Sequence, residues 1–169
     1  MQVEHPVTEE VTGLDLVELQ LHIAATGALP LAQADVRCSG HAFEARLCAE
    51  DADAGFLPAT GQLQVVDFSR SGVRIESGVD SGDDISPHYD SMIAKLIAHG
   101  TDREAARRAL GAGLRASTVI GLVTNLEFLH ELLEWPETRD ATFHTRLIDE
   151  RHAQPVSYTH LTLPTILLV

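Results

Sequence analysis

Hydrophobic and polar positions follow two distinct patterns in the first third of the chain. Between residues 14 and 25 the apolar positions recur at intervals of three and four, the spacing of one helix face. Gly27 is suited to end that helix, and Pro30 prevents its continuation. From Gly40 to Cys48 the pattern changes to alternation, which predicts a strand. Residues 28–37 are therefore expected to connect a helix to a strand.

The alternating strand has two chemically different faces. One face carries a mostly apolar set: His41, Phe43, Ala45 and Leu47. The other face places Glu44 and Arg46 side by side, because residues two apart in a strand point to the same side. This strand is therefore expected to bring a carboxylate and a guanidinium together.

Further strands are predicted in the middle of the chain. Residues 62–68 and 73–77 have strand composition and flank the turn 69–72, and residues 92–99 form a mostly apolar run of strand length. Residues 51–61 between them contain glycine and proline and are expected to form a loop.

The pattern becomes helical after residue 100. Thr101–Glu104 and Thr124–Glu127 both have the spacing of a capping box, and we expect them to open two helices. The first should end near Ser117 and the second before Pro136, with a short last turn at residues 143–148. The order of helix, antiparallel strands and two helices predicts an α+β fold.

Composition narrows the possible functions. The chain has 169 residues, enough for one ordinary domain, and 44% of them are hydrophobic. Its formal net charge of −13 opposes general binding to nucleic acid. The two cysteines, Cys38 and Cys48, form neither a disulfide framework nor a metal motif, so we expect reduced thiols in a cytoplasmic protein and no metal site within this chain.

The two ends of the chain differ from each other. The first residues contain Glu4, Glu9 and Glu10 and no apolar run, so they are not a signal peptide. Residues 155–169 contain no Asp, Glu, Lys or Arg and are shorter than the ~20 residues of a membrane span. We expect residues 153–169 to be a non-native tail, with a native edge strand as the alternative.

Only a few residues have the character of a reaction site. Glu4 lies in a segment that Pro6 should keep extended, and a fixed carboxylate can act as a general base. Arg46 beside Glu44 could hold an anion, and Asp90 lies where a loop meets a strand. Each has a simpler interpretation: Glu4 solvated, Glu44 and Arg46 forming a surface ion pair, and Asp90 capping a turn. No glycine-rich phosphate loop precedes a helix, so composition and spacing alone do not support a nucleotide enzyme.

The motifs together resemble a known family. Gln2–Glu9, with the sequence QVEHPVTE, is similar to a signature of the biotin carboxylase component of biotin-dependent carboxylases. The resemblance continues in order through Gly40–Arg46, Tyr89–Leu96 and Thr124–Leu129, and covers about residues 1–152. The residues of Gly121–Asn125 and His88–Asp90 are most similar to those of acyl-CoA carboxylases of the methylcrotonyl or geranyl type.

The resemblance implies a reaction and a set of site residues. The family activates bicarbonate with Mg-ATP and transfers the carboxyl group to biotin on a carrier domain. Glu4 corresponds to the base acting on bicarbonate, and Gln2 and Val3 to residues that help to bind it. Arg46 corresponds to the arginine that stabilises the biotin anion, while Asp90 and Lys95 match family positions in a supporting role.

The resemblance also implies that this chain is a C-terminal fragment. Residues 1–35 would be the end of an ATP-grasp domain and residues 36–152 the biotin carboxylase C-terminal domain. The family's metal ligands and ATP-contacting lysines correspond to positions before Met1, so we expect neither ATP, Mg nor biotin to be bound by this chain alone. Its partners would be a biotin carboxyl carrier domain, a carboxyltransferase subunit and further copies in a homo-oligomer, without nucleic acid or membrane. The alternative is a non-catalytic binding or assembly module that keeps the same fold.

Overall fold

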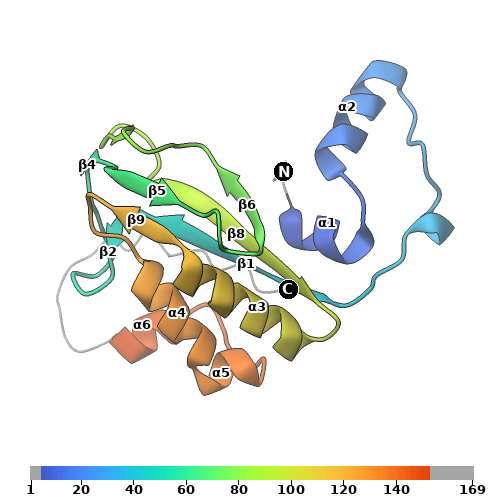
Figure 1. The fold of residues 1–169 in the computed structure, drawn as a ribbon. Helices are drawn as coiled ribbons and strands as arrows, with labels where there is room; N and C mark the ends of the chain where they lie inside the picture. The colour runs from blue at the N-terminus through green and yellow to red at the C-terminus, as the bar shows by residue number, and fades with distance from the viewer. Residues whose placement is uncertain (1–4, 153–169) are drawn as a thin grey trace.

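The computed structural model describes residues 5–152 and confirms the α+β fold (Figure 1). Its centre is a three-stranded antiparallel sheet in the order β1-β8-β6. The strands are β1 (His41–Cys48), β6 (Arg74–Ser77) and β8 (Met92–Gly100). The two long strands were predicted almost to the residue, because their side-chain patterns are unbroken.

The register of the sheet places the charged side chains. Arg46 of β1 lies opposite Lys95 of β8, and Lys95 lies opposite Glu76 of β6. The pairing of β1 with β8 is irregular between Leu47 and Cys48, one residue beyond Arg46. Opposite residues of antiparallel strands share a face, so one charged row crosses all three strands.

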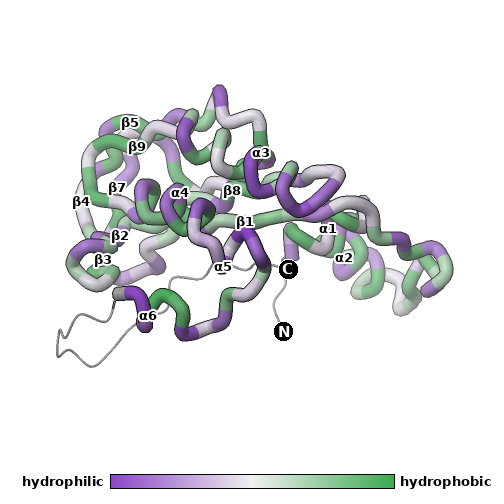
Figure 2. The backbone as a smooth tube through the Cα atoms, turned by 90° about the horizontal axis from the view of Figure 1, so that it is seen from below, coloured by the Kyte–Doolittle hydropathy of each residue, from purple (hydrophilic) through white to green (hydrophobic). Residues whose placement is uncertain are grey.

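The other face of the sheet is the core. Helix α3 (Arg103–Ala116) packs on β8 and β1, and α4 (Leu126–Glu134) packs on α3 and β1. In Figure 1 both helices lie on the same side of the sheet. Buried side chains from strands and helices meet between them, among them Phe43, Ala45, Leu47, Leu96, Leu110, Leu114 and Leu129. Figure 2 shows hydrophobic colour along β1 and β8, the strands that this core surrounds.

Short strands close the end of the sheet near Cys48. They pair as β2 (Glu50–Asp51) with β3 (Leu57–Pro58), β4 (Gly61–Gln62) with β7 (Asp84–Ile85), and β5 (Val65–Asp67) with β9 (Thr118–Ile120). The single strand predicted at residues 62–68 is therefore wrong, because its two halves pair with different partners. The sequence did not predict β9, whose three residues are too few to show a pattern.

Two helices precede the sheet. Helix α1 (Pro6–Thr12) was not predicted, although Pro6 is suited to the first turn of a helix. Helix α2 (Leu16–Thr26) was predicted, and Gly27 ends it in a left-handed conformation. A single 3-10 turn at Gln33–Asp35 lies in the connector to β1. Helix α1 contacts β1 and β8, whereas α2 has no buried residue and extends away from the sheet (Figure 1).

The predicted capping boxes are wrong in their details. Asp102, not Thr101, caps α3 and accepts a hydrogen bond from the Ala105 amide at 2.8 Å, and Glu104 pairs with Arg107 instead. Asn125 occupies the N-cap position of α4, but its side chain makes no capping bond. Pro136 ends α4 as expected and opens α5 (Pro136–Arg139). The last helix, α6 (Leu147–His152), begins later than the short turn predicted at residues 143–148 and overlaps it only at residues 147 and 148.

None of the helices between residues 5 and 152 has both the length and the apolar character needed to cross a membrane.

Candidate functional site

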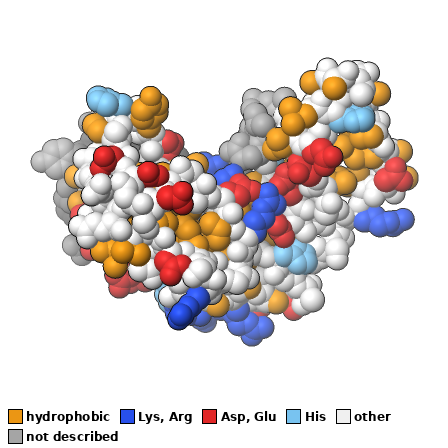
Figure 3. All heavy atoms as spheres, turned by 45° about the horizontal axis from the view of Figure 1, so that its top comes forward, with side chains coloured by type: hydrophobic (Ala, Val, Ile, Leu, Met, Phe, Trp, Pro, Cys, Tyr) orange, Lys and Arg blue, Asp and Glu red, His pale blue; other side chains and the backbone are white. Residues whose placement is uncertain are grey.

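The sheet face opposite α3 and α4 carries the charged row. Figure 3 shows acidic and basic side chains meeting in the hollowed middle of the molecule. Arg46, Lys95 and Glu76 lie across the three strands, with Glu44 and Arg74 in the next row. The alternation of each strand puts these groups on this face, because the intervening residues fill the core.

Glu44 and Arg46 are close but not hydrogen-bonded. Arg46 Nε lies 3.6 Å from Glu44 Oε1, and Glu44 is only 1% exposed. Both atoms are buried, and neither has a hydrogen-bond partner within residues 5–152. Burial raises the pKa of Glu44, while the nearby charges of Arg46 and Lys95 oppose that rise. The interpretation as an ordinary surface ion pair is therefore wrong.

Lys95 belongs to a second ion pair on the same face. Its Nζ lies 2.5 Å from Glu76 Oε2, and the Lys95 side chain is almost fully buried. Burial opposes ionisation of Glu76, but hydrogen bonds from Lys95 and Arg74 outweigh it and lower the Glu76 pKa. Lys95 and its partner Glu76 thus lie beside Arg46 on this face.

Arg74 joins the sheet to helix α1. Its Nη2 donates to Glu9 Oε2 at 2.7 Å and to Glu76, and its Nη1 donates to Glu10 Oε1 at 3.3 Å. The other oxygen of Glu9 accepts a hydrogen bond from the Leu16 amide at 3.0 Å, so Glu9 also fixes the start of α2. Helix α1 is therefore anchored beside the charged row.

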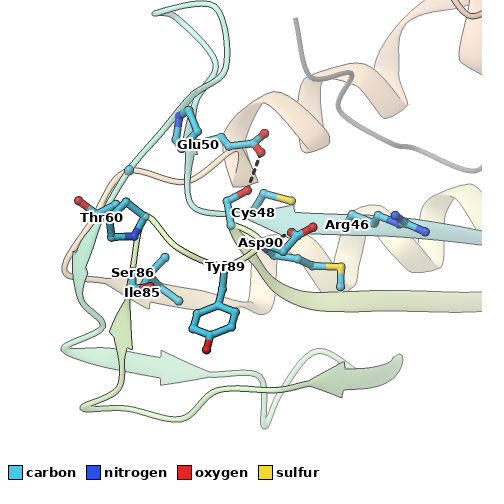
Figure 4. A pocket seen from close by; sticks show the side chains of 13 residues that line it. Arg46, Cys48, Glu50, Thr60, Ile85, Ser86, Tyr89 and Asp90 are labelled. Carbon is cyan, nitrogen blue, oxygen red and sulfur yellow. Dashed lines mark hydrogen bonds between the residues drawn. The ribbon is translucent and has the colours of Figure 1, made fainter.

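A hollow of about 570 Å³ opens next to Arg46. Figure 4 shows Arg46 at one side of it and Thr60 and Ser86 at the other, with Tyr89 and Asp90 between. Ser91 donates a hydrogen bond of 2.6 Å to Glu50 Oε1, while Glu50 Oε2 is buried without a hydrogen-bond partner among the described residues. An arginine and two acidic residues thus line the hollow, and such groups suit a small polar ligand.

Two other groups at the hollow have structural explanations. Burial, with the charges of Glu50 and Asp90, raises the pKa of the Cys48 thiol to about 12, so this thiol is not a nucleophile at neutral pH. Asp90 accepts a hydrogen bond from the Met92 amide at 2.8 Å, and so caps a turn while it lines the hollow. Within residues 5–152, no group of three His, Cys, Asp or Glu side chains could hold a metal ion.

The structure brings some of the predicted site residues together. Arg46 and Lys95 are opposite each other in the sheet, and Asp90 and Arg46 line the same hollow. Gln2, Val3 and Glu4 lie outside the described residues, directly before the anchored α1.

Sequence reasoning missed four charged residues on or beside this face: Glu9, Glu50, Arg74 and Glu76. Two of them had a usable signal, because Arg74 and Glu76 repeat the two-residue spacing of Glu44 and Arg46 on a predicted strand.

Two family descriptions match the chain. The Biotin carboxylase C-terminal domain matches residues 44–150, and the Carbamoyl-phosphate synthase L chain, ATP binding domain, matches residues 1–32.

Several curated proteins are similar to the chain. The mitochondrial methylcrotonoyl-CoA carboxylase subunit alpha of Mus musculus is 46% identical over 154 residues, which are 90% of this chain and 22% of that protein. The biotin carboxylase of Haemophilus influenzae is 46% identical over 134 residues, 79% of this chain and 30% of that protein. This chain therefore spans less than a third of the length of either relative.

Solved structures have the same fold. The biotin carboxylase domain of a thermophilic 2-oxoglutarate carboxylase, bound to bicarbonate, superposes with a TM-score of 0.85 at 37% identity. The biotin carboxylase subunit of a pyruvate carboxylase superposes with a TM-score of 0.84 at 35% identity. Each match covers 89% of this chain and 34% of that one. Because the first family description covers more than half of the chain, and Arg46 lies within it, this chain belongs to the biotin carboxylase C-terminal domain family.

Proposed function

We propose that this chain is part of a biotin carboxylase subunit of an acyl-CoA carboxylase, which uses bicarbonate and ATP to carboxylate biotin on a carrier domain. The observation that carries the proposal is the Glu44–Arg46 pair, whose buried Oε1 and Nε atoms have no hydrogen-bond partner in residues 5–152. Leaving such groups unpaired costs stability, and the Arg46 side chain, which is 22% exposed, is still accessible to a ligand. A relative of the same fold is described as bound to bicarbonate.

Arg46 suits the proposed biotin site. Its guanidinium, in a side chain that is 22% exposed, can donate a hydrogen bond to the ureido oxygen of biotin and stabilise negative charge there. Lys95, held by Glu76, adds positive charge to the same face, and Asp90 shapes the turn beside the hollow. The residues that the structure describes therefore fit biotin as a ligand of Arg46, with Lys95 and Asp90 in supporting roles.

Glu4 is proposed as the base that takes the proton of bicarbonate, with Gln2 and Val3 as bicarbonate-binding residues. The placement of α1 supports this, because Arg74 anchors the helix that follows Glu4 beside Arg46. When bound, Mg-ATP would supply the phosphoryl group that activates bicarbonate. The match of residues 1–32 to an ATP-binding domain supports the proposed division into an ATP-grasp end at 1–35 and a C-terminal domain at 36–152.

The proposed partners are those of the reaction: a biotin carboxyl carrier domain, a carboxyltransferase subunit and further copies of the subunit. The cytoplasmic location predicted from the sequence stays a prediction, because the mouse and rat relatives are named as mitochondrial.

A chimera tests the proposal. Residues 1–152 replace the matching segment of the Haemophilus influenzae biotin carboxylase, and biotin-dependent phosphate release from ATP is measured with bicarbonate. We expect the chimera to be active and the 169-residue chain alone to show no biotin-stimulated release. A chimera that folds but has no activity, or a 169-residue chain that turns over, would contradict the proposal.

The second candidate is a non-catalytic binding or assembly module with this fold. One observation favours it: α2 and the segment after it expose the apolar side chains of Val17, Leu21, Ile23 and Leu29. An inactive chimera together with self-association of the 169-residue chain, lost on Leu21→Gln, would support this candidate over the enzyme.

A further inference from the structure

Asn125 lies beside the free edge of β1, the strand that carries Arg46. It is 1% exposed and stands at the start of α4. Its Oδ1 accepts a hydrogen bond from the Cys48 amide at 2.9 Å, and its Nδ2 donates one to the Arg46 carbonyl oxygen at 3.1 Å. The backbone N–H of Asn125 donates a third hydrogen bond to the Cys48 carbonyl oxygen at 3.1 Å. One residue thus makes three hydrogen bonds to two residues of β1.

These bonds replace a missing neighbouring strand. Strand β1 is at the edge of the three-stranded sheet, with β8 on its other side. The carbonyl of a strand residue and the amide two residues later point to the same side, so an unpaired edge leaves both without a partner. The Asn125 carboxamide satisfies this pair for Arg46 and Cys48, as a strand would.

The position of these bonds along β1 is informative. The pairing of β1 with β8 becomes irregular between Leu47 and Cys48, so the ladder does not fix this end of the strand by itself. Arg46 lies one residue before the irregularity. Asn125 holds the backbone on both sides of it, and the direction in which Arg46 leaves the strand depends on that backbone.

A helix-capping role does not account for this side chain. Asn125 is at the N-cap position of α4, where an asparagine usually accepts a hydrogen bond from the helix. Its side chain makes no such bond, and both ends of its carboxamide are used on β1.

We propose that Asn125 is a positioning residue for Arg46: it fixes the β1 backbone so that the guanidinium projects onto the charged face of the sheet. This inference rests on the proposed role of Arg46 in carboxylation, and Asn125 itself touches no reacting group.

The first test uses the 169-residue chain and nuclear magnetic resonance. Asn125→Ala removes both side-chain bonds, and Asn125→Asp keeps the acceptor for Cys48 but loses the donor to Arg46. We expect exchange of the Cys48 amide to accelerate about tenfold or more in Asn125→Ala, relative to Leu96 in the core strand. The Arg46 Nε–Hε resonance should shift in both variants. Thr124→Ala, next to Asn125, is the control and should leave both signals unchanged. An unshifted Arg46 resonance in Asn125→Ala would overturn the proposal.

The second test is a double-mutant cycle in the chimera described above. We expect Asn125→Ala to lower kcat for biotin carboxylation about tenfold when Arg46 is present, and to cause no further loss in an Arg46→Ala background. The stability loss from Asn125→Ala should be the same in both backgrounds, because the backbone bonds remain. Equal losses of kcat in both backgrounds would show a merely structural role and overturn the inference alone. Full activity of Arg46→Ala would overturn the proposed function.

Discussion

Two arginines in this domain pair with neighbouring carboxylates in opposite ways. Arg107 on α3 is 5% exposed and donates to both oxygens of Glu104 at 2.7 and 2.8 Å, to Glu134 at 2.7 Å and to the Leu133 carbonyl oxygen at 2.9 Å. Arg46 on β1 approaches Glu44 only to 3.6 Å, and its Nε has no hydrogen-bond partner in the described part of the chain. One cluster is satisfied by its own residues, and the other is not.

This difference in hydrogen bonding indicates that the two arginines have different roles. Buried polar groups in proteins are nearly always hydrogen-bonded, because an unpaired one costs about 1–3 kcal/mol. The Arg107 cluster follows this rule and ties α3 to α4. The Arg46 pair departs from it beside a hollow of about 570 Å³. We infer that Arg107 contributes to stability and that Arg46 is available to a ligand.

Removing Arg107 should have the largest effect on stability. Arg107→Ala loses hydrogen bonds to two carboxylates and leaves the Leu133 carbonyl unpaired, so we expect a loss of about 2–4 kcal/mol in the free energy of unfolding. Urea unfolding of the 169-residue chain measures it. The control is Arg108→Ala, because that neighbour is 67% exposed in its side chain and lies 3.9 Å from Glu104; its cost should stay below about 1 kcal/mol. Equal losses in the two variants would contradict the structural role of Arg107.

Glu44→Gln should change the pH dependence of stability in one direction. The Glu44 pKa is raised in the folded state, so the unfolded chain loses this proton first as pH rises. Stability is therefore expected to fall from about pH 4.5 upward through the raised pKa, and Glu44→Gln should remove that fall. Unfolding curves measured across this range test it, with the exposed Glu131→Gln as the control for the loss of one charge. An unchanged slope in Glu44→Gln would contradict the burial effect.

Glu104→Gln should have a smaller effect of the opposite sign. Its hydrogen bonds with Arg107 lower the Glu104 pKa to about 2. The stabilisation is thus present above pH 4.5, the ordinary value, and is lost as pH falls toward 2. Glu104→Gln should flatten the acid side of the stability profile and leave the region above pH 4.5 parallel to wild type. Unfolding curves measured across this pH range test the prediction. An acid slope in Glu104→Gln equal to that of the wild type would refute it.

The sequence predicted the local feature on which this comparison depends, namely which side chains share a face of β1. Alternation in residues 41–48 correctly placed Glu44 and Arg46 on one face, because the period of a strand is fixed by its backbone. It did not predict that Glu44 is buried, since burial depends on what covers the face. The simpler interpretation of Asp90 as a turn residue was confirmed.

Contacts between residues far apart in the sequence could not be predicted. Arg74 meets Glu9 across 65 positions and Asn125 meets Arg46 across 79, and such pairs depend on register and helix packing. Asn125 did show a local signal, a helix start, but it pointed to the wrong partner: its carboxamide binds β1 instead of capping α4. Tertiary contacts outweighed local preference at this position.

The most direct test of the account compares Arg46→Ala with Arg139→Ala in the chimera. Arg139 pairs with Glu134 in the satisfied cluster and its side chain is 52% exposed, so its loss should leave the rate of biotin carboxylation unchanged. Arg46→Ala should lower that rate by well over about tenfold, the scale of a lost contact to developing charge. Equal rates for the two variants, at equal folded fractions, would contradict the claim that the unsatisfied arginine is the functional one.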